Sequence, residues 1–103
     1  MNLFSRRPCF DTGIKTAKTT ENAVLLDVRT AEEFAAGHVP GSVNLPLDVI
    51  ATIAIPTSAP LFVYCHSGAR SARACEILIQ RGYTVTNIGG IVEYSGTTER
   101  GGI

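Results

Sequence analysis

The chain has no tryptophan, a single methionine and no surplus of charge of either sign. Nine basic residues balance nine acidic ones, so no overall field favours a nucleic acid or an anionic membrane as a partner. No apolar run approaches the roughly 20 residues that span a bilayer. The opening residues 1–7 lack the apolar region of a signal peptide, which favours a cytoplasmic location.

Cysteine is also scarce, with only Cys9, Cys65 and Cys75. An odd number without metal-ligand spacing argues against a disulfide framework and against a zinc site. We expect Cys9 to pack as a small hydrophobe rather than to be an exposed thiol. Cys75 is expected to be buried and structural, although a resolving role toward Cys65 is an alternative.

Length and composition indicate one globular domain over residues 1–103. Hydrophobic residues make up 45% of the chain and charged residues 17%, which does not fit a disordered chain. There is no internal repeat and no interdomain linker. We expect the core to cover about residues 7–94 and the glycine-containing segment 95–103 to be loosely ordered.

Strand and helix patterns alternate along the chain. Four short apolar runs predict strands: 24–28, 43–45, 61–64 and 85–88. A further edge strand is a candidate within residues 1–10. Helices are predicted in five places: 11–18, 30–37, 47–53, 69–80 and 91–94. This alternation predicts a mostly parallel α/β sheet of about five strands with helices on both faces.

Several residues set the limits of these helices. Thr30 and Glu33 form a capping box, and the helix that they start is expected to end at a left-handed Gly37. Asp11 is expected to cap the first helix, and Gly82 to close the longest one.

Cys65 follows the predicted strand 61–64 and faces the start of the predicted helix 69–80. In an open α/β sheet, ligands bind in the crevice at this end of the strands. A free thiol with a pKa near 8.5 is only about 3% ionised at pH 7. The helix N-terminus, the backbone N–H groups of the turn and Arg70 would favour the thiolate, and Gly68 suits a turn of unusual φ. The sequence therefore predicts Cys65 as a nucleophile.

Other strand ends should lie beside this turn, because parallel strands end at one edge of a sheet. Asp27 and Arg29 follow one such strand, and Gly89 and Gly90 follow another. The double glycine predicts a turn where backbone segments approach closely.

Taken together, these residues resemble the single-domain rhodaneses, which are thiosulfate sulfurtransferases with a three-layer α/β/α fold. The resemblance covers about residues 23–94. It rests on four stretches in order: Leu26-Asp27-Val28-Arg29 with Glu32-Glu33-Phe34, residues 37–46, Val63-Tyr64-Cys65 with Arg70-Ser71, and Ile88-Gly89-Gly90. The chain departs from the family at Tyr94, where members often carry a tryptophan after the double glycine.

The resemblance implies that Cys65 takes a sulfur atom from thiosulfate or another sulfane-sulfur donor as a persulfide. Cyanide, a small thiol or a thioredoxin-like protein would then accept the sulfur, without a metal or organic cofactor. The implied donor-binding residues follow the cysteine: His66, Ser67, Gly68, Ala69 and Arg70. The implied supporting residues are Asp27, Arg29, Gly89 and Gly90, with Arg29 paired to Glu33 and His38 structural. We expect a monomer.

Other functions fit part of the same pattern. A persulfide carrier within a sulfur relay would keep both Cys65 and Arg70, as an autonomous enzyme does. Cysteine phosphatases and arsenate reductases resemble the site, but they use five residues between cysteine and arginine where this chain has four. An inactive binding module is less favoured, because inactive relatives usually lose the cysteine or the arginine.

Overall fold

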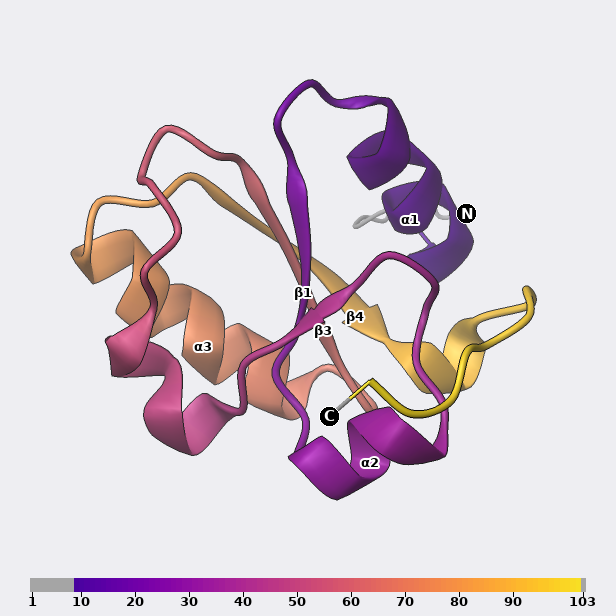
Figure 1. The fold of residues 1–103 in the computed structure, drawn as a ribbon. Helices are drawn as coiled ribbons and strands as arrows, with labels where there is room; N and C mark the ends of the chain where they lie inside the picture. The colour runs from indigo at the N-terminus through magenta and orange to yellow at the C-terminus, as the bar shows by residue number, and fades with distance from the viewer. Residues whose placement is uncertain (1–8, 103) are drawn as a thin grey trace.

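Four parallel strands form the centre of the molecule (Figure 1). In this computed structural model, which describes residues 9–102, they lie in the order β2-β1-β3-β4. Their bounds are β1 (Val24–Asp27), β2 (Val43–Asn44), β3 (Leu61–Cys65) and β4 (Val85–Gly90). The predicted parallel α/β architecture is confirmed, with four strands within residues 9–102 where the sequence predicts about five. The further edge strand expected within residues 1–10 falls almost entirely outside the described residues.

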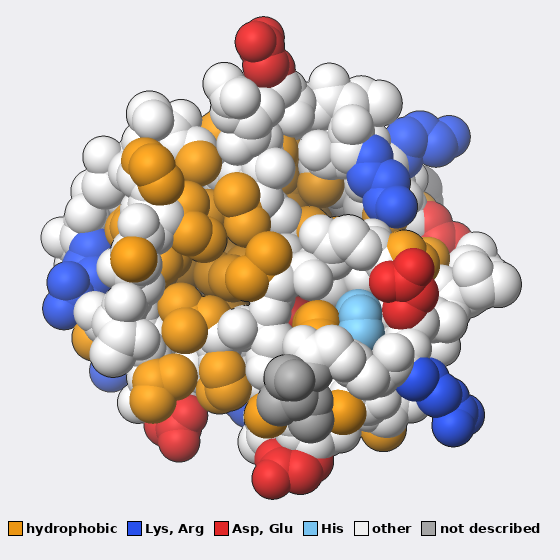
Figure 2. Space-filling view, viewed as in Figure 1, with side chains coloured by type: hydrophobic (Ala, Val, Ile, Leu, Met, Phe, Trp, Pro, Cys, Tyr) orange, Lys and Arg blue, Asp and Glu red, His pale blue; other side chains and the backbone are white. Residues whose placement is uncertain are grey.

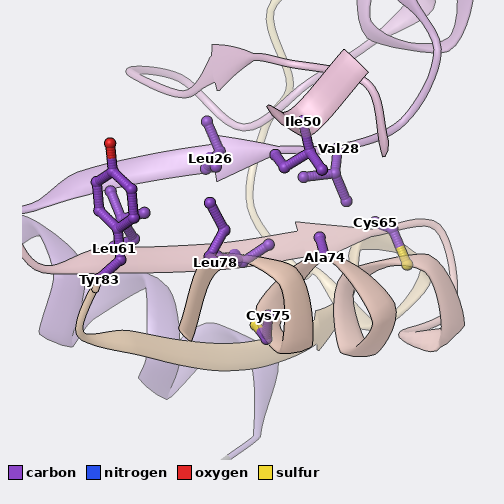
Figure 3. Packing of buried hydrophobic residues seen from close by; sticks show 10 residues of the cluster. Leu26, Val28, Ile50, Leu61, Cys65, Ala74, Cys75, Leu78 and Tyr83 are labelled. Atoms are coloured by element: carbon purple, nitrogen blue, oxygen red, sulfur yellow. The ribbon is translucent and has the colours of Figure 1, made fainter. Parts of the chain in front are cut away.

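Helices cover both faces of this sheet. Their bounds are α1 (Phe10–Thr19), α2 (Ala31–Ala36), η1 (Leu47–Thr52), α3 (Ala69–Gln80) and η2 (Ile91–Glu93), where η marks a 3-10 helix. α3 and η1 pack on one face, over a cluster that contains Leu26, Leu61 and Leu78 (Figure 3). α1 packs on the other face, against Leu25 and Phe62. Because both faces are covered, the strands are apolar throughout rather than alternating.

The first helix begins one residue earlier than the sequence predicts. Cys9 occupies the N-cap position and is exposed, so the expectation that it packs as a small hydrophobe is wrong. Asp11 lies in the first turn and does not cap the helix. Its carboxylate instead accepts hydrogen bonds from the backbone N–H and the hydroxyl of Ser95, a residue that is distant in sequence.

The capping box of α2 is confirmed. The Glu33 N–H donates to Thr30 Oγ1 at 3.1 Å, and the Thr30 N–H donates to Glu33 Oε1 at 2.9 Å. Gly37 ends the helix, but its φ of 160° is extended, so the left-handed conformation that the sequence predicts for this residue is wrong. The extended backbone leads into His38, which pairs with Glu99 from the end of the chain.

The double glycine belongs to β4 rather than to a turn that follows it. Val63 lies opposite Asn87 and Tyr64 opposite Gly89, so Ile88 is an extra residue in β4, that is, a bulge. Gly89 has a φ of +102°, a backbone conformation that favours glycine. The bulge lets β4 continue beside β3 as far as Cys65, which lies opposite Gly90.

The segment after η2 runs back along the molecule and contacts α2. His38 and Glu99 exchange two backbone hydrogen bonds of 2.8 Å, and the Gly101 N–H donates to Ala35 O at 2.9 Å. The sequence predicts loose order here, whereas in the structure this segment forms backbone hydrogen bonds to His38 and Ala35.

Hydrophobic side chains gather around a hollow on one face (Figure 2). A cavity of about 420 Å³ lies beside β2, lined by residues of β1, β2 and the segment 52–55. Its lining includes none of the predicted site residues. Among residues 9–102, no helix is long and apolar enough to cross a membrane.

Candidate active site

Cys65 ends β3 and lies against the first turns of α3 (Figure 3). The residue is only 1% exposed. Its sulfur accepts a hydrogen bond from the Gly68 N–H at 3.0 Å and another from the Ser71 N–H at 3.3 Å. Gly68 has a φ of +108°, and this left-handed conformation turns its N–H toward the sulfur. The turn therefore folds back on the thiol, as the sequence predicts.

Two opposing effects act on the ionisation of this thiol. Burial raises the pKa of Cys65, because it penalises the thiolate. Hydrogen bonds from the Ser71 hydroxyl and from the N–H groups of Ser71, Gly68 and Ser67 outweigh burial, so the pKa of Cys65 lies below its ordinary value. Thiolate is consequently more abundant at neutral pH than in a free cysteine.

Arg70 is held by α2 rather than free beside the sulfur. Its Nη1 and Nη2 lie 2.7 and 2.9 Å from the two carboxylate oxygens of Glu33. The hydrogen bond from Arg70 holds the pKa of Glu33 at about 2, against 4.5 for an unpaired glutamate. This two-point ion pair fixes the guanidinium and compensates its charge. Recognition of an anionic donor by Arg70 stays a prediction.

The expected pair between Arg29 and Glu33 is wrong, because Arg29 binds Asp27 instead. Nη2 of Arg29 lies 2.8 Å from Oδ2 of Asp27, and the Arg29 N–H also donates to this carboxylate. Both side chains are buried. The same Nη2 donates to Gly37 O at 2.8 Å. Asp27 and Arg29 therefore join the end of β1 to the end of α2.

Gly90 lies where two backbone segments approach closely. A Cβ atom on this residue would overlap the backbone of His66 and Ser67. The close approach that the sequence predicts for the double glycine is confirmed, although it occurs within a strand. No side chain is tolerated without moving the turn that contains the predicted nucleophile.

The remaining turn residues differ in exposure. His66, Ser67 and Ala69 are exposed, whereas Gly68 is buried. The carbonyl of His66 accepts a hydrogen bond from the Val92 N–H at 3.2 Å, which joins the turn to η2. The side chains of the exposed residues are therefore free to meet a ligand or a partner.

His38 and Cys75, for which the sequence predicts structural roles, are both buried. His38 stacks on Phe34 with ring centroids 3.6 Å apart, and its Nδ1 lies 2.8 Å from Phe34 O. Cys75 is buried, as the sequence predicts, and burial raises its pKa to about 11. A thiol with this pKa is un-ionised at neutral pH, which does not favour a resolving role.

Sequence reasoning did not assign a role to Ser71 and missed Asn87. The hydroxyl of Ser71 is fully buried, 3.6 Å from the sulfur of Cys65 and 2.8 Å from Oδ1 of Asn87. Asn87 Oδ1 also accepts a hydrogen bond from the Gly89 N–H at 3.0 Å. The available signal was a single amide side chain immediately before the Ile88-Gly89-Gly90 motif, but its partner on α3 depends on the tertiary structure.

A pocket of about 290 Å³ lies beside Arg70. It is lined by residues of both polar and apolar type: Val28, Thr30, Pro46, Leu47, Asp48 and Arg70. Its apolar side and its two charged residues would accommodate a small, partly polar molecule. Within residues 9–102, no group of three or more histidine, cysteine, aspartate and glutamate side chains could hold a metal ion.

Comparison with known proteins identifies the family. A model of the rhodanese-like domain matches residues 12–97. A sulfurtransferase of Allochromatium vinosum is 41% identical over 80 residues, which cover 74% of this chain and 75% of that protein. The thiosulfate sulfurtransferase PspE of Escherichia coli is 41% identical over 71 residues, covering 64% of this chain and 68% of PspE.

Similarity in structure agrees with similarity in sequence. The rhodanese-like domain protein from Staphylococcus aureus superposes with a TM-score of 0.80 at 25% identity, covering 95% of this chain and 100% of that one. Most of the fold described above, including the sheet and the turn after β3, lies within the matched residues. The chain therefore belongs to the rhodanese-like domain family.

Proposed function

We propose that this protein is a sulfurtransferase in which Cys65 carries the transferred sulfur as a persulfide. The observation that carries the proposal is a buried thiol whose sulfur accepts two backbone hydrogen bonds at the start of α3. Two relatives bear the name sulfurtransferase, which supports the same chemistry. The sulfur-binding turn is the residue set 66–70.

In the first half-reaction, the Cys65 thiolate attacks the outer sulfur of thiosulfate. A bond forms between Sγ and that sulfur, the sulfur–sulfur bond of thiosulfate breaks, and sulfite leaves with the electron pair. In the second half-reaction, cyanide or a thiolate attacks the outer sulfur of the persulfide. Sγ then leaves as a thiolate and recovers its electron pair. Cys65 is thus a nucleophile first and a leaving group second.

Hydrogen bonding in the turn suits both half-reactions. The donors that lower the pKa of Cys65 supply thiolate at neutral pH, and they stabilise the same thiolate when it leaves. The persulfide is also anionic, and N–H groups aimed into a buried site stabilise a charged sulfur there. A four-residue spacing between cysteine and arginine favours sulfur over the larger phosphate, so phosphatase chemistry is not proposed.

Arg70 and the adjacent pocket form the proposed approach path for substrates. Nη1 and Nη2 of Arg70 each donate one hydrogen to Glu33. The N–H of Nε and the second hydrogen of each Nη are the groups that would bind a donor anion. We propose thiosulfate as donor and cyanide, a small thiol or a thioredoxin-like protein as acceptor, with no metal or organic cofactor. A monomer in the cytoplasm is part of the same proposal.

The proposal is tested by the intact mass of the reduced protein before and after incubation with thiosulfate. We expect a gain of one sulfur atom that cyanide or a thiol removes. Cys65→Ser should abolish this gain, because the substituted oxygen cannot form the persulfide. Cys9→Ser removes an exposed thiol and should retain the gain, which makes it the matched control.

A gain of one sulfur atom by the Cys65→Ser variant would contradict the proposal. A gain from a persulfidated donor protein, but none from thiosulfate, would instead identify a carrier in a sulfur relay. In that case, a mixture of the protein, thiosulfate and cyanide would form no thiocyanate.

A further inference from the structure

In the thiol form the Cys65 S–H donates to Ser71 Oγ. Once Cys65 is a thiolate, the one hydrogen of the Ser71 hydroxyl has three acceptors within reach. Its Oγ lies 2.8 Å from Oδ1 of Asn87, 3.0 Å from Gly68 O and 3.6 Å from Sγ of Cys65. Ser71 is fully buried, so bulk water does not reach the group. A hydroxyl donates only one hydrogen bond at a time. The acceptors must therefore compete for it.

Asn87 is fixed in position by the bulge of β4. Its Oδ1 accepts the Gly89 N–H at 3.0 Å, next to the shift in register between β3 and β4. Because this N–H requires an acceptor, the oxygen rather than the amide nitrogen of Asn87 faces Ser71. Asn87 is consequently an acceptor for the hydroxyl and not a donor to it.

The two half-reactions make opposite demands on Sγ. A nucleophile reacts faster when its charge is less stabilised, whereas a leaving group departs faster when its charge is more stabilised. A hydroxyl that donates to Sγ stabilises the thiolate. A hydroxyl that donates to Asn87 leaves the thiolate with only its backbone donors.

We propose that Asn87 is a positioning residue that competes with Sγ of Cys65 for the hydroxyl hydrogen of Ser71, and so balances Cys65 between nucleophile and leaving group. The proposal rests on the proposed role of Cys65 as the sulfur carrier. Asn87 contacts the hydroxyl directly, and it acts on the sulfur only through Ser71.

The other groups around the sulfur do not provide this balance. Arg70 and Cys75 on α3 both interact with Cys65 through charge, but Arg70 is paired with Glu33 and the pKa of Cys75 is about 11. Asp27 and Arg29 at the end of β1 neutralise each other. His66 is exposed, and it is unchanged in all the variants that test this balance.

The rate of alkylation of Cys65 by iodoacetamide, measured against pH in a Cys9→Ser background, tests the competition. Asn87→Ala should lower the midpoint of the profile, because the hydroxyl is then shared only between Gly68 O and the sulfur and donates to the sulfur more often. If the midpoint falls by about one pH unit, the thiolate below the midpoint is about tenfold more abundant and about threefold less nucleophilic. We therefore expect alkylation there to be about threefold faster. Ser71→Ala should shift the midpoint in the opposite direction.

Two further variants make the outcome independent of damage to the bulge. Asn87→Asp keeps an oxygen for the Gly89 N–H, holds the hydroxyl more strongly and should raise the midpoint. In the Ser71→Ala background, Asn87→Ala should leave the midpoint unchanged, because the hydroxyl is gone. Thr86→Ala, an exposed neighbour on β4, is the control and should leave it unchanged in any background.

A midpoint that rises in Asn87→Ala, or does not move, would overturn the proposal. So would a shift of the same size in the Ser71→Ala background, since Asn87 would then act by another route. Single-turnover rates add a second measurement: above the midpoint, Asn87→Ala should form the persulfide about threefold more slowly and discharge it faster. Alkylation involves no sulfur transfer, so it separates failure of this proposal from failure of the proposed function.

Discussion

At the scale of single residues, the candidate site is a set of short contacts to one buried sulfur. Backbone N–H groups of Gly68 and Ser71 provide two of these contacts, and the Ser71 hydroxyl provides the third. The charged side chains of the predicted site form closed pairs, Asp27 with Arg29 and Glu33 with Arg70. Hydrogen bonds rather than an unpaired cation therefore favour the thiolate.

The pair of Glu33 and Arg70 predicts a dependence of stability on pH. The pKa of Glu33 is about 2 in the folded protein against 4.5 when unpaired, so the pair stabilises the fold above about pH 4.5 and loses this contribution as pH falls toward 2. Both side chains are about a third exposed, and we expect less than about 1 kcal/mol. Urea unfolding of Glu33→Gln should show the loss at neutral pH and none near pH 2.

The control for this variant is Glu76→Gln, which removes an exposed carboxylate that pairs with Arg73 within α3. It should change the free energy of unfolding by a smaller amount at every pH. An equal loss in Glu33→Gln at pH 2 and at neutral pH would contradict the role of the charge pair.

Gly90 predicts a steric effect on the site. In Gly90→Ala the new methyl group would overlap the backbone of His66 and Ser67, so the turn must move away from β4. We expect a loss of about 1–3 kcal/mol in the free energy of unfolding. Sulfur transfer should fall further than in a variant of equal stability elsewhere, and unchanged transfer would show that the turn tolerates displacement.

At the scale of elements, α2 links the candidate site to the rest of the molecule. Its first turn holds Arg70 through Glu33, and Gly37 at its end accepts a hydrogen bond from Arg29. The same helix is only six residues long, so it depends on its cap and on these contacts rather than on its own propensity.

Removal of the cap should therefore affect both stability and the site. Thr30→Ala deletes the hydroxyl that accepts from the Glu33 N–H, and we expect the free energy of unfolding to fall by about 1 kcal/mol. Loosening of Glu33 should also weaken the hold on Arg70 and raise the KM for thiosulfate. Urea unfolding and steady-state kinetics measure the two effects.

Thr16→Ala is the matched control, because that hydroxyl is exposed and, among the described residues, bonds only to the carbonyl of Thr12 in its own helix. It should leave both measurements nearly unchanged. Equal effects of the two threonine substitutions would show that the capping box is not what holds α2 in place.

At the scale of the whole molecule, the last residues return to α2 and close one side of the fold (Figure 1). The amides of Glu99 and Gly101 donate to His38 O and Ala35 O. If these bonds persist in solution, hydrogen exchange at both amides should be at least about tenfold slower than in an unstructured peptide. Exchange at unprotected rates would instead support the loose order that the sequence predicts.

Four features could be predicted from the amino-acid sequence: the parallel α/β fold, the long helix 69–80, the capping box of α2 and the turn after Cys65. These features depend on periodicity and on residues close together in the chain, where local physics is decisive. The Cys65 motif spans only a strand end and the next helical turn. Its backbone donors could therefore be predicted before the tertiary structure was known.

Contacts between residues distant in the sequence depend on the folded path of the chain. The sequence offers two arginines as ion-pair partners for Glu33. In the folded chain Glu33 pairs with Arg70, whereas Arg29 pairs with Asp27. Asn87, next to the bulge in β4, accepts a hydrogen bond from Ser71. The carboxylate of Asp11 accepts a hydrogen bond from Ser95 instead of capping α1. Residues distant in the sequence pair according to the path of the folded chain, which propensity and spacing do not specify.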